Sequence, residues 1–379
     1  MSGYEWVYLR PDAISVWRDP EVRRRLNWYM RVMLGEAPAK FVMARRFPVD
    51  LEGDPWEADT ETLWRVHEKA AEDFRRMYRR VREGSEEFRD LPRDPGVSLL
   101  HVKAVLAHRL ASPCILCERR CKVERALGRI GACRIDYGTY VHSAFLHLGE
   151  EAPLVPSGTI FYGGCNFSCV FCQNYDVSQT APRAGMRVDA VRLAEIQDAL
   201  ARKGARNINH VGGDPTPSMH TIMESLLYVE SSVPQLWNSN FYMSLEAMEL
   251  LVDVIDIWLP DFKYGNNKCA FRLSAIPRYF EVVTRNLKIA VEHGDMIIRH
   301  LVMPNHLECC TRPVLEWIAR NLPKDRVLVN IMDQYTPMHR VARRPRLWPD
   351  IARRPTREEV EEAYRLADEL GLAWRQVSR

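Results

Sequence analysis

Three cysteines stand at a spacing that suits an iron–sulfur cluster. Cys165, Cys169 and Cys172 form the pattern Cys-x3-Cys-x2-Cys within YGGCNFSCVFCQNYDVS. Three thiolates on one short loop can hold three irons of a cubane 4Fe–4S cluster, and the fourth iron then stays open to another ligand. The alternative is a zinc loop whose fourth ligand lies elsewhere in the chain. An open iron predicts chemistry on a bound substrate or cofactor rather than simple electron transfer.

A second cysteine group precedes the first. Its members, within SPCILCERRCKVERALGRIGACRI, are Cys114, Cys117, Cys121 and Cys133. Four thiolates at this spacing can close a tetrahedral zinc site, and they can equally hold a second 4Fe–4S cluster. The spacing leaves both readings open, together with the case in which no metal binds. With either metal we expect a role in structure or in electron transfer.

The other three of the ten cysteines, Cys269, Cys309 and Cys310, are scattered along the chain, and we expect ordinary buried thiols there. In a reducing cytosol, clustered cysteines are more often metal ligands than disulfides. The N-terminus lacks a basic segment followed by an apolar one, and no apolar run is long enough to span a membrane. We therefore expect a cytoplasmic protein without a membrane partner.

The composition is that of a large folded chain. With 379 residues, 46% of them hydrophobic and 27% charged, the chain is neither a disulfide-stapled scaffold nor a disordered one. A net charge of +3 provides no global attraction to nucleic acid or anionic lipid. The run RRMYRRVR is basic, but the acidic EEFRD follows it closely, so we interpret it as a solvated helix face.

Strand-like and helical segments alternate from Thr159 onward. This alternation predicts a parallel sheet with right-handed crossovers, in six units rather than the eight of a closed TIM barrel. The fold class is therefore α/β, a partial (β/α)6 TIM-like barrel at 151–379. It follows a helical N-terminal extension at 1–110 and a small Cys-rich metal-binding segment at 111–150. The expected strands are 159–164, 207–213, 235–240, 256–262, 296–304 and 326–334.

A last helix is predicted after the final strand. Thr356 and Glu359 form a capping box at its start, and Gly371 closes it.

Polar motifs stand at the ends of the expected strands, where parallel α/β sheets bind ligands. A bare Gly-Gly-Asp-Pro is also common in ordinary turns. Arg299, inside an apolar strand, is costly to bury without an anion, and the alternative to a bound ligand is a salt bridge with a nearby acid. The motifs are Gly212-Gly213-Asp214-Pro215, Asn238-Ser239-Asn240, Asp261 with Lys263, and Arg299.

Taken together, these motifs resemble the radical S-adenosylmethionine (SAM) superfamily. Within it they resemble the pyruvate formate-lyase activating enzyme homologues that carry a Cys-rich segment before the barrel. The resemblance spans about 142–337 in order and leaves the first 100 residues outside. The stretches that carry it are FLHLGEEAPL, SGTIFYGGCNFSCVFCQNY, HVGGDPTP, WNSN, IDIWLPDFKYG, IRHLVMPNH and DQYTP.

The resemblance implies a 4Fe–4S cluster on Cys165, Cys169 and Cys172 whose open iron binds the amino and carboxylate groups of S-adenosylmethionine. One-electron reduction then cleaves the S–C5′ bond and gives a 5′-deoxyadenosyl radical. The resemblance implies that Phe171 lies near the adenine and that Gly212 and Gly213 lie near the methionyl amino group, with Asp214 where the family more often has Glu. It places Asn238, Ser239 and Asn240 near the ribose and Arg299 on the carboxylate. It also places Asp261, with its neighbour Lys263, beside a monovalent cation.

The implied activity is that of a radical SAM oxidoreductase that abstracts hydrogen from its substrate. In activating enzymes the substrate is a protein glycine, and an electron donor such as flavodoxin or ferredoxin reduces the cluster. The same core also supports modification of RNA, a peptide or a metabolite, and basic and aromatic residues among the first 100 positions keep the RNA version open. A different class of protein, a non-catalytic iron–sulfur or zinc electron-transfer module, would not need the polar residues at the strand ends.

Overall fold

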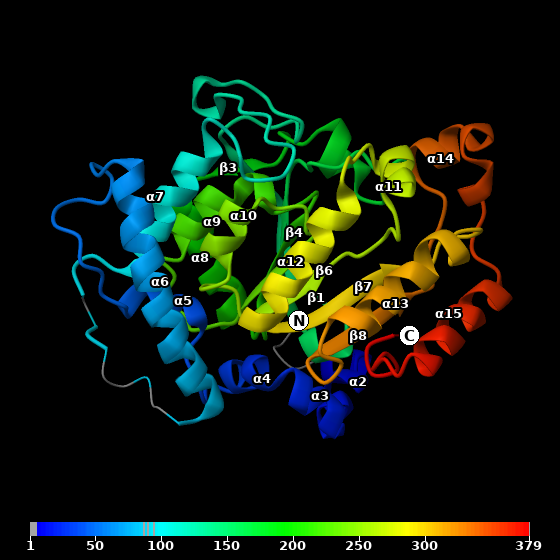
Figure 1. The fold of residues 1–379 in the computed structure, drawn as a ribbon, viewed down its shortest axis with the longest axis horizontal. Coiled ribbons are helices and arrows are strands. Elements are labelled where there is room, and N and C mark those ends of the chain that lie inside the picture. Colours follow the sequence, from blue (N-terminus) through cyan, green and yellow to red (C-terminus); the bar gives the residue numbers. More distant parts are fainter. Residues whose placement is uncertain (1–5, 86–87, 89–90, 94, 379) are drawn as a thin grey trace.

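The computed structural model describes residues 6–85, 88, 91–93 and 95–378. Two stretches used in the sequence analysis lie outside the described residues. They are residues 1–5, at the N-terminus that was searched for a signal peptide, and most of the acidic run EEFRD. Within the described part, no helix combines the length and the apolar character needed to cross a membrane. The sheet runs through the centre, with α5–α7 on one side and α2–α4 below it (Figure 1).

The described strands form one sheet in the order β3-β1-β2-β4-β5-β6-β7-β8. The run from β2 to β8 is parallel, which confirms the partial barrel and its six expected strands. Two antiparallel strands, β1 and β3, extend the sheet beyond β2 and were not expected. The strands are β1 (Thr139–His147), β2 (Ser157–Tyr162), β3 (Met186–Val188), β4 (Ile208–Gly212), β5 (Gln235–Ser239), β6 (Ile257–Pro260), β7 (Asp295–Leu301) and β8 (Val327–Met332).

Helices connect the parallel strands, as the alternation predicts. The last helix begins with the expected capping box, because the Glu359 N–H donates to Thr356 Oγ1 at 3.2 Å and the Thr356 N–H to Glu359 Oε2 at 2.7 Å. The helices of this region are α8 (Ala190–Arg202), α9 (Met219–Ser225), α10 (Leu245–Leu251), α11 (Asn267–Ser274), α12 (Tyr279–His293), α13 (Arg312–Asn321), α14 (His339–Arg343) and α15 (Arg357–Glu369).

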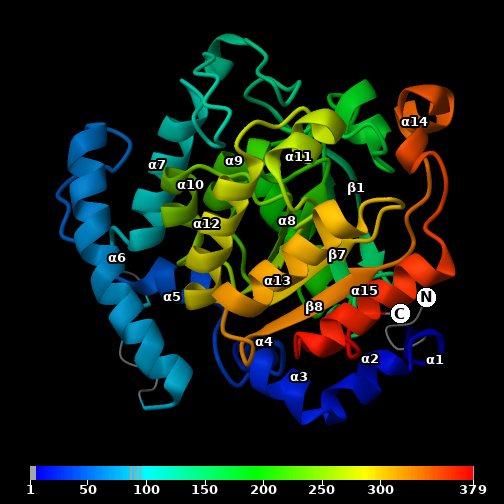
Figure 2. The ribbon, with the colours of Figure 1, turned by 45° about the vertical axis from the view of Figure 1, so that its right-hand side comes forward.

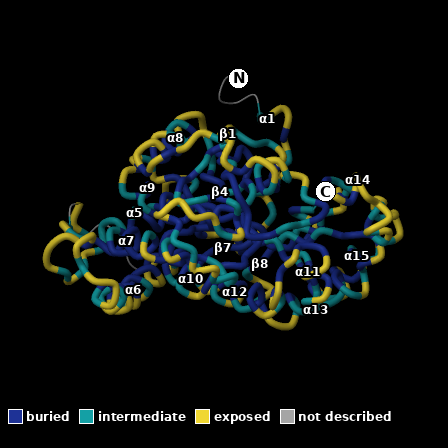
Figure 3. Tube along the Cα trace, turned by 90° about the horizontal axis from the view of Figure 1, so that it is seen from above, coloured by how far each residue is buried: buried dark blue, intermediate teal, exposed yellow. Residues whose placement is uncertain are grey.

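The described part of the first hundred residues is largely helical and packs against the barrel. One hydrophobic cluster contains residues from all three predicted segments, among them Phe74, Leu116 and Ile160, so the boundaries at 110 and 150 stay a prediction. Figure 3 shows the buried trace running through the sheet, with exposed residues at the periphery. The helices are α1 (Trp6–Leu9), α2 (Asp12–Ser15), α3 (Pro20–Arg25), α4 (Asn27–Met33), α5 (Lys40–Arg46), α6 (Thr60–Glu83) and α7 (Leu99–Ala111).

Buried polar contacts attach these helices to the amino ends of the strands. Asp256, which precedes β6, accepts hydrogen bonds from Trp28 Nε1 at 2.8 Å and from the Lys40 N–H at 3.0 Å. Asp295, the first residue of β7, accepts from the Tyr29 N–H at 2.8 Å. The amino ends of these strands are thereby covered, which leaves the carboxyl ends for a site (Figure 2).

Two arginines of the basic run on α6 form ion pairs with the barrel. Arg75 Nε donates to Asp253 Oδ1 at 2.7 Å, and Arg82 Nη2 donates to Asp295 Oδ1 at the same distance. Both acids are buried, so α6 presents part of its charge inward. The expected fully solvated helix face is therefore only partly correct.

Candidate active site

The three cysteines of the Cys-x3-Cys-x2-Cys motif lie on the loop that follows β2. The chain turns through Gly164, whose φ is +86°; a Cβ there would lie 2.7 Å from the carbonyl oxygen of Cys133. Cys165 is buried, and its sulfur accepts from the Phe167 N–H at 3.3 Å. A glycine is required here because both the left-handed backbone and the close neighbour exclude a side chain.

Each of the other two sulfurs has a hydroxyl beside it. Ser274 Oγ donates to Cys169 Sγ at 3.0 Å, and Ser178 Oγ lies 3.4 Å from Cys172 Sγ. Burial raises the pKa of Cys169 to about 11. The Cys169 thiol therefore becomes a thiolate readily only when a metal ion replaces its proton.

The loop and the strand ends enclose one cavity of about 230 Å³. Every candidate cofactor residue from the sequence lines it, together with residues of the DQYTP stretch to which the sequence assigned no role. The lining includes Cys165, Cys169, Phe171, Cys172, Gly212, Gly213, Asp214, Asn238, Ser239, Asn240, Asp261, Lys263, Arg299, Gln334, Tyr335 and Thr336.

Gly212 and Gly213 pack directly against the cysteine loop. A Cβ on Gly212, whose φ is +117°, would lie 2.2 Å from the Tyr162 nitrogen, and one on Gly213 would lie 2.1 Å from the Gly164 oxygen. Neighbouring protein backbone therefore already demands both glycines. Their predicted contact with the methionyl amino group stays a prediction.

Asp214 positions the turn rather than pointing into open space. Its Oδ1 accepts from the Thr216 N–H and its Oδ2 from the Asn240 N–H, both at 3.0 Å. Burial raises the pKa of Asp214 to about 6, against the lowering effect of these two hydrogen bonds. The shorter Asp thus uses both oxygens to join the ends of β4 and β5.

Asn238, within β5, and Asn240, directly after it, have different surroundings. Asn240 Nδ2 donates to Asn166 Oδ1 at 2.6 Å and lies 3.7 Å from Cys165 Sγ. Asn238 Nδ2 is buried without a hydrogen-bond partner, although Asn238 lines the cavity. A buried amide with an unused donor is the pattern expected where a ligand supplies the acceptor.

Asp261 and Lys263 pair with each other. Lys263 Nζ donates to Asp261 Oδ2 at 2.5 Å. Burial favours the neutral amine, but the Asp261 carboxylate and the Cys169 sulfur outweigh it and raise the pKa of Lys263. The ammonium of Lys263 therefore stands against the carboxylate that was expected to hold a monovalent cation, and the geometry adds no support for that cation.

Arg299 has two carboxylate partners that the sequence did not reveal, Glu150 and Glu151. Its Nε and Nη2 donate to the two oxygens of Glu151 at 2.7 Å each, and Nη2 also contacts Glu150. Its remaining Nη1 donates to Asn238 Oδ1 at 3.4 Å. The salt-bridge alternative is thus present, and Arg299 orients Asn238 while lining the cavity.

Phe171 packs edge-on against Tyr335, with ring centroids 5.7 Å apart. Both rings line the cavity, so an apolar wall lies where the adenine is expected.

The second cysteine group surrounds its own small cavity, of about 20 Å³. Gly131 allows close packing there, since its Cβ would lie 3.0 Å from Cys121 Sγ. Arg125, fully buried, lines the same cavity; its Nε and Nη2 donate to the Asp136 carbonyl, while Nη1 has no partner. The thiols that share this cavity are Cys114, Cys117, Cys121 and Cys133.

The remaining cysteines are scattered along the sequence but lie together in space; that they are ordinary thiols stays a prediction. Cys269, Cys309 and Cys310 meet around His306, with all four ligand atoms within 4.8 Å of one another. The spacing His306-x2-Cys309-Cys310 was a signal in the sequence, but Cys269 lies on a separate helix, and only the fold brings it near.

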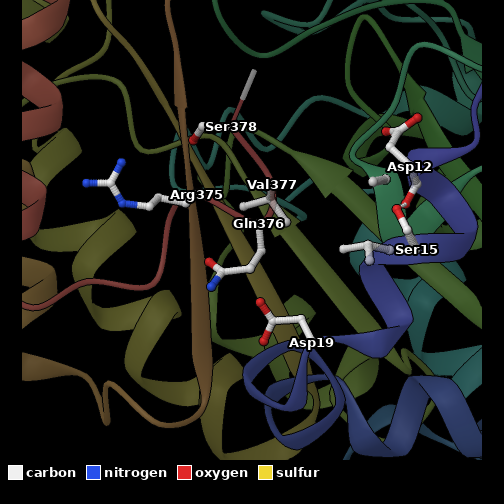
Figure 4. Close-up of a pocket in the computed structure, with 9 residues that line it drawn as sticks. Asp12, Ser15, Asp19, Arg375, Gln376, Val377 and Ser378 are labelled. Carbon is white, nitrogen blue, oxygen red and sulfur yellow. Dashed lines mark hydrogen bonds between the residues drawn. The ribbon is translucent and has the colours of Figure 1, made fainter.

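A larger cavity, of about 570 Å³, lies far from this chemistry, between the α2 region and the C-terminal residues. Its charged residues have structural partners, since Asp12 pairs with Arg10 and Arg375 with Asp368. Figure 4 shows Arg375 pointing away from Asp12 and Asp19. We therefore place the active site at the cysteine loop.

Comparison with known proteins agrees with this geometry. A family model described as the Radical SAM superfamily matches residues 159–318. The chain is 41% identical over 354 residues to the Uncharacterized protein MJ0674 of Methanocaldococcus jannaschii, covering 92% of this chain and 98% of that protein. This chain belongs to the radical SAM superfamily. It is also 24% identical over 212 residues to the Uncharacterized protein MJ0808 of the same organism, covering 51% of this chain and 61% of that protein.

Among solved structures, the chain resembles SuiB of Streptococcus suis. The structure bound to S-adenosylmethionine aligns with a TM-score of 0.39 at 15% identity, over 57% of this chain and 48% of SuiB. The structure bound to the precursor peptide SuiA aligns with a TM-score of 0.38, also at 15% identity, over 57% of this chain and 46% of SuiB. The alignment of this chain thus spans about half the length of SuiB.

Radical SAM proteins use a 4Fe–4S cluster and S-adenosylmethionine. The residues present fit both groups. Three thiols with adjacent donors suit a cluster, and the unpartnered Asn238 amide in the same cavity suits a polar organic ligand.

Proposed function

We propose that this protein is a radical SAM enzyme in which Cys165, Cys169 and Cys172 hold the 4Fe–4S cluster and the strand-end residues hold S-adenosylmethionine. The supporting observation is that the three thiols and the ends of β4–β7 line one cavity. When both groups are bound, reductive cleavage of the S–C5′ bond supplies a 5′-deoxyadenosyl radical that removes hydrogen from a substrate.

The residues of the chain have positioning roles in this proposal. Asp214 fixes the Asn240 backbone, and Asn240 in turn holds Asn166 beside Cys165. Arg299 holds Asn238 so that its free amide can donate to the bound cofactor. Phe171 and Tyr335 exclude water from one wall because their rings pack together. Lys263 and Asp261 form an ion pair near Cys169, so the charge of each is neutralised by the other.

For the group of Cys114, Cys117, Cys121 and Cys133, we propose a second 4Fe–4S cluster rather than zinc. A single zinc ion draws its ligand atoms within about 4 Å of one another. Among the residues that the structure describes, these thiols do not form such a compact set. The buried Arg125 places a positive charge beside the cavity, which offsets the negative charge of four metal-bound thiolates with either metal.

For the substrate, we propose a protein or peptide segment, as in the activating enzymes that the sequence resembles. The support for this substrate class is the resemblance itself, which spans about 142–337 in order. An RNA substrate gains no support from α6, because Arg75 and Arg82 are ion-paired with the barrel.

The test uses the full-length protein, reconstituted anaerobically and reduced by dithionite, flavodoxin or ferredoxin. We expect 5′-deoxyadenosine from S-adenosylmethionine, and a higher yield when cell extract is added. Protease treatment of the extract should remove this stimulation, whereas nuclease treatment should not. After ultrafiltration of the extract, the stimulation should be found in the retained fraction. Stimulation that survives protease but not nuclease would favour RNA, and stimulation in the filtrate would favour a metabolite. A complete lack of 5′-deoxyadenosine would favour a non-catalytic electron-transfer protein.

A further inference from the structure

A compact set of four metal-ligating side chains lies outside the cofactor cavity. Among the residues that the structure describes, Cys269, His306, Cys309 and Cys310 are the only group of three or more potential ligands whose ligand atoms all lie within 4.8 Å. Cys269 is on α11, and the other three belong to the segment after β7 that includes the π-helical turn Leu307–Thr311.

The distances match those around one tetrahedral ion. Zinc–sulfur bonds of about 2.3 Å place two sulfurs about 3.8 Å apart, and a nitrogen ligand about 3.5 Å from each sulfur. Cys309 Sγ lies 3.8 Å from Cys269 Sγ and 3.9 Å from Cys310 Sγ. His306 Nδ1 lies 3.3 Å and 3.5 Å from the sulfurs of Cys309 and Cys310.

Neither a disulfide nor a cubane cluster suits this set. A disulfide bond is about 2.05 Å long, and all three thiols are free. A cubane places each thiolate on a separate iron, which spreads the sulfurs more widely than one shared ion does.

The surroundings of the set fix its ligands. His306 Nε2 donates to Asp350 Oδ2 at 2.9 Å, which leaves the Nδ1 lone pair directed at the thiols. Arg272 Nη1 donates to the other oxygen of Asp350 at 3.1 Å, and its Nη2 lies 3.2 Å from His306 Nε2 because both groups point at that carboxylate. A carboxylate behind a ligating imidazole is the usual outer partner in zinc sites.

A second outer contact reaches the cysteines. Asn266 Nδ2 donates to the Cys309 carbonyl at 2.7 Å and lies 3.5 Å from Cys269 Sγ. His306 and Cys310 are only 3% and 1% exposed, so the set is largely closed to water. Four protein ligands without an open position characterise structural rather than catalytic zinc.

The set is connected to the loop of the proposed cluster through α11. Cys269 lies in the first turn of this helix, and Leu273 and Ser274 at its end accept hydrogen bonds from the N–H groups of Val170 and Ser168 at 2.9 Å and 3.0 Å. Ser274 Oγ also donates to Cys169 Sγ. Fixing Cys269 to the segment after β7 therefore fixes the helix on which the cysteine loop rests.

We propose that Cys269, His306, Cys309 and Cys310 bind one zinc ion, with release of the three thiol protons to solvent, and that this closed site braces the loop of Cys165, Cys169 and Cys172. The site is independent of the catalytic proposal, since no cofactor contact enters its argument.

The test measures metal content in anaerobically purified, cluster-reconstituted full-length protein. We expect one equivalent of zinc in the wild type, its loss in Cys309→Ser and His306→Ala, and its retention in His306→Cys, which restores a fourth thiolate. The iron content should stay unchanged. Asp350→Asn should keep the ligands but weaken zinc binding by about 10- to 100-fold in a chelator competition. His339→Gln, which alters another buried histidine, is the matched control and should keep its zinc.

A second measurement does not depend on the stability of the ligand variants. Cobalt exchanged into the wild type should give the intense visible bands of a tetrahedral thiolate site, and these bands should be absent in His306→Ala and present in His339→Gln. Hydrogen exchange of residues 165–172 should be faster in zinc-free Asp350→Asn than in zinc-loaded protein. Zinc content equal to the wild type in His306→Ala, iron in place of zinc, or a Cys269–Cys309 disulfide in freshly purified protein would each overturn the proposal.

Discussion

The N–H of Cys165 donates to the carbonyl oxygen of Cys133 at 3.3 Å. The last cysteine of the Cys-rich segment and the first cysteine of the loop after β2 are thus joined through main chain. Gly164 makes this approach possible, because any side chain there would meet the same carbonyl. The two proposed clusters therefore lie close enough for one to deliver electrons to the other.

The first prediction separates assembly of the cluster from its tuning. Cys169→Ala should lose the loop cluster and all 5′-deoxyadenosine formation. Ser274→Ala should keep the cluster but lower its reduction potential, because hydrogen bonds to cluster sulfurs stabilise the reduced, more negative form. Iron analysis and a redox titration followed by electron paramagnetic resonance measure both effects. An unchanged potential in Ser274→Ala would mean that its hydroxyl does not contact a ligating sulfur.

The second prediction concerns the Cys-rich segment. Replacement of its four cysteines by alanine should remove about four irons per chain. It should leave S-adenosylmethionine binding intact, since none of these four cysteines lines the cavity at the loop of Cys165, Cys169 and Cys172. Reduction of the remaining cluster by flavodoxin should become slower, while reduction by dithionite should not. Loss of one zinc with unchanged iron would contradict our assignment of this segment.

The third prediction follows from the partners of Arg299. Arg299→Gln should lower the free energy of unfolding by about 3–5 kcal/mol, because Glu151 is then buried without a cation and Glu150 keeps only His147 as a partner. The triple variant Arg299→Met, Glu150→Gln, Glu151→Gln should recover most of this loss. Urea unfolding of the three proteins measures the effect. If Arg299 mainly served the cofactor carboxylate, Arg299→Gln would weaken binding and leave the stability of the cofactor-free protein unchanged.

The fourth prediction is a pH dependence at the same network. Burial alone would raise the pKa of Glu150, but Arg299 and His147 outweigh it and lower it to about 2. In the unfolded chain the Glu150 carboxyl has an ordinary glutamate pKa of about 4.3. Between this pH and the pKa of about 2 in the folded protein, the unfolded chain therefore binds more protons than the folded one, and the free energy of unfolding falls as the pH drops through this window. The contribution lost is about 3 kcal/mol. Glu150→Gln should lack this pH-dependent part when its unfolding is compared with the wild type at each pH.

The sequence predicted the parallel core well because short strand-like runs alternate there with amphipathic helices. β6 (IWLP) and β8 (VLVNIM) are mostly apolar and mostly buried, and they stand out as sequence patterns. β1, by contrast, is half exposed and mixes histidine, serine and threonine with apolar residues, and β3 has only three residues. Such edge strands gain their structure from pairing rather than from local pattern.

The partners of charged and metal-ligating residues were harder to predict. The sequence showed that Arg299 needs an anion, but Glu151 lies 148 positions away and only the fold brings it into contact. The same holds for Cys269 and Cys309, which are 40 positions apart. Local spacing identifies a ligand set when its members share one loop, and it fails when two elements contribute to the set.

The covering of the amino ends of the strands by Trp28, Tyr29 and Lys40 has a kinetic consequence. Access to the cysteine loop is confined to the opposite end of the barrel, so a macromolecular substrate and a reductase protein that docked directly on this loop would compete for that end. Turnover should then be ordered, with electron delivery before substrate docking. Excess substrate should slow reduction by a protein donor in a competitive manner while leaving reduction by a small chemical reductant unaffected.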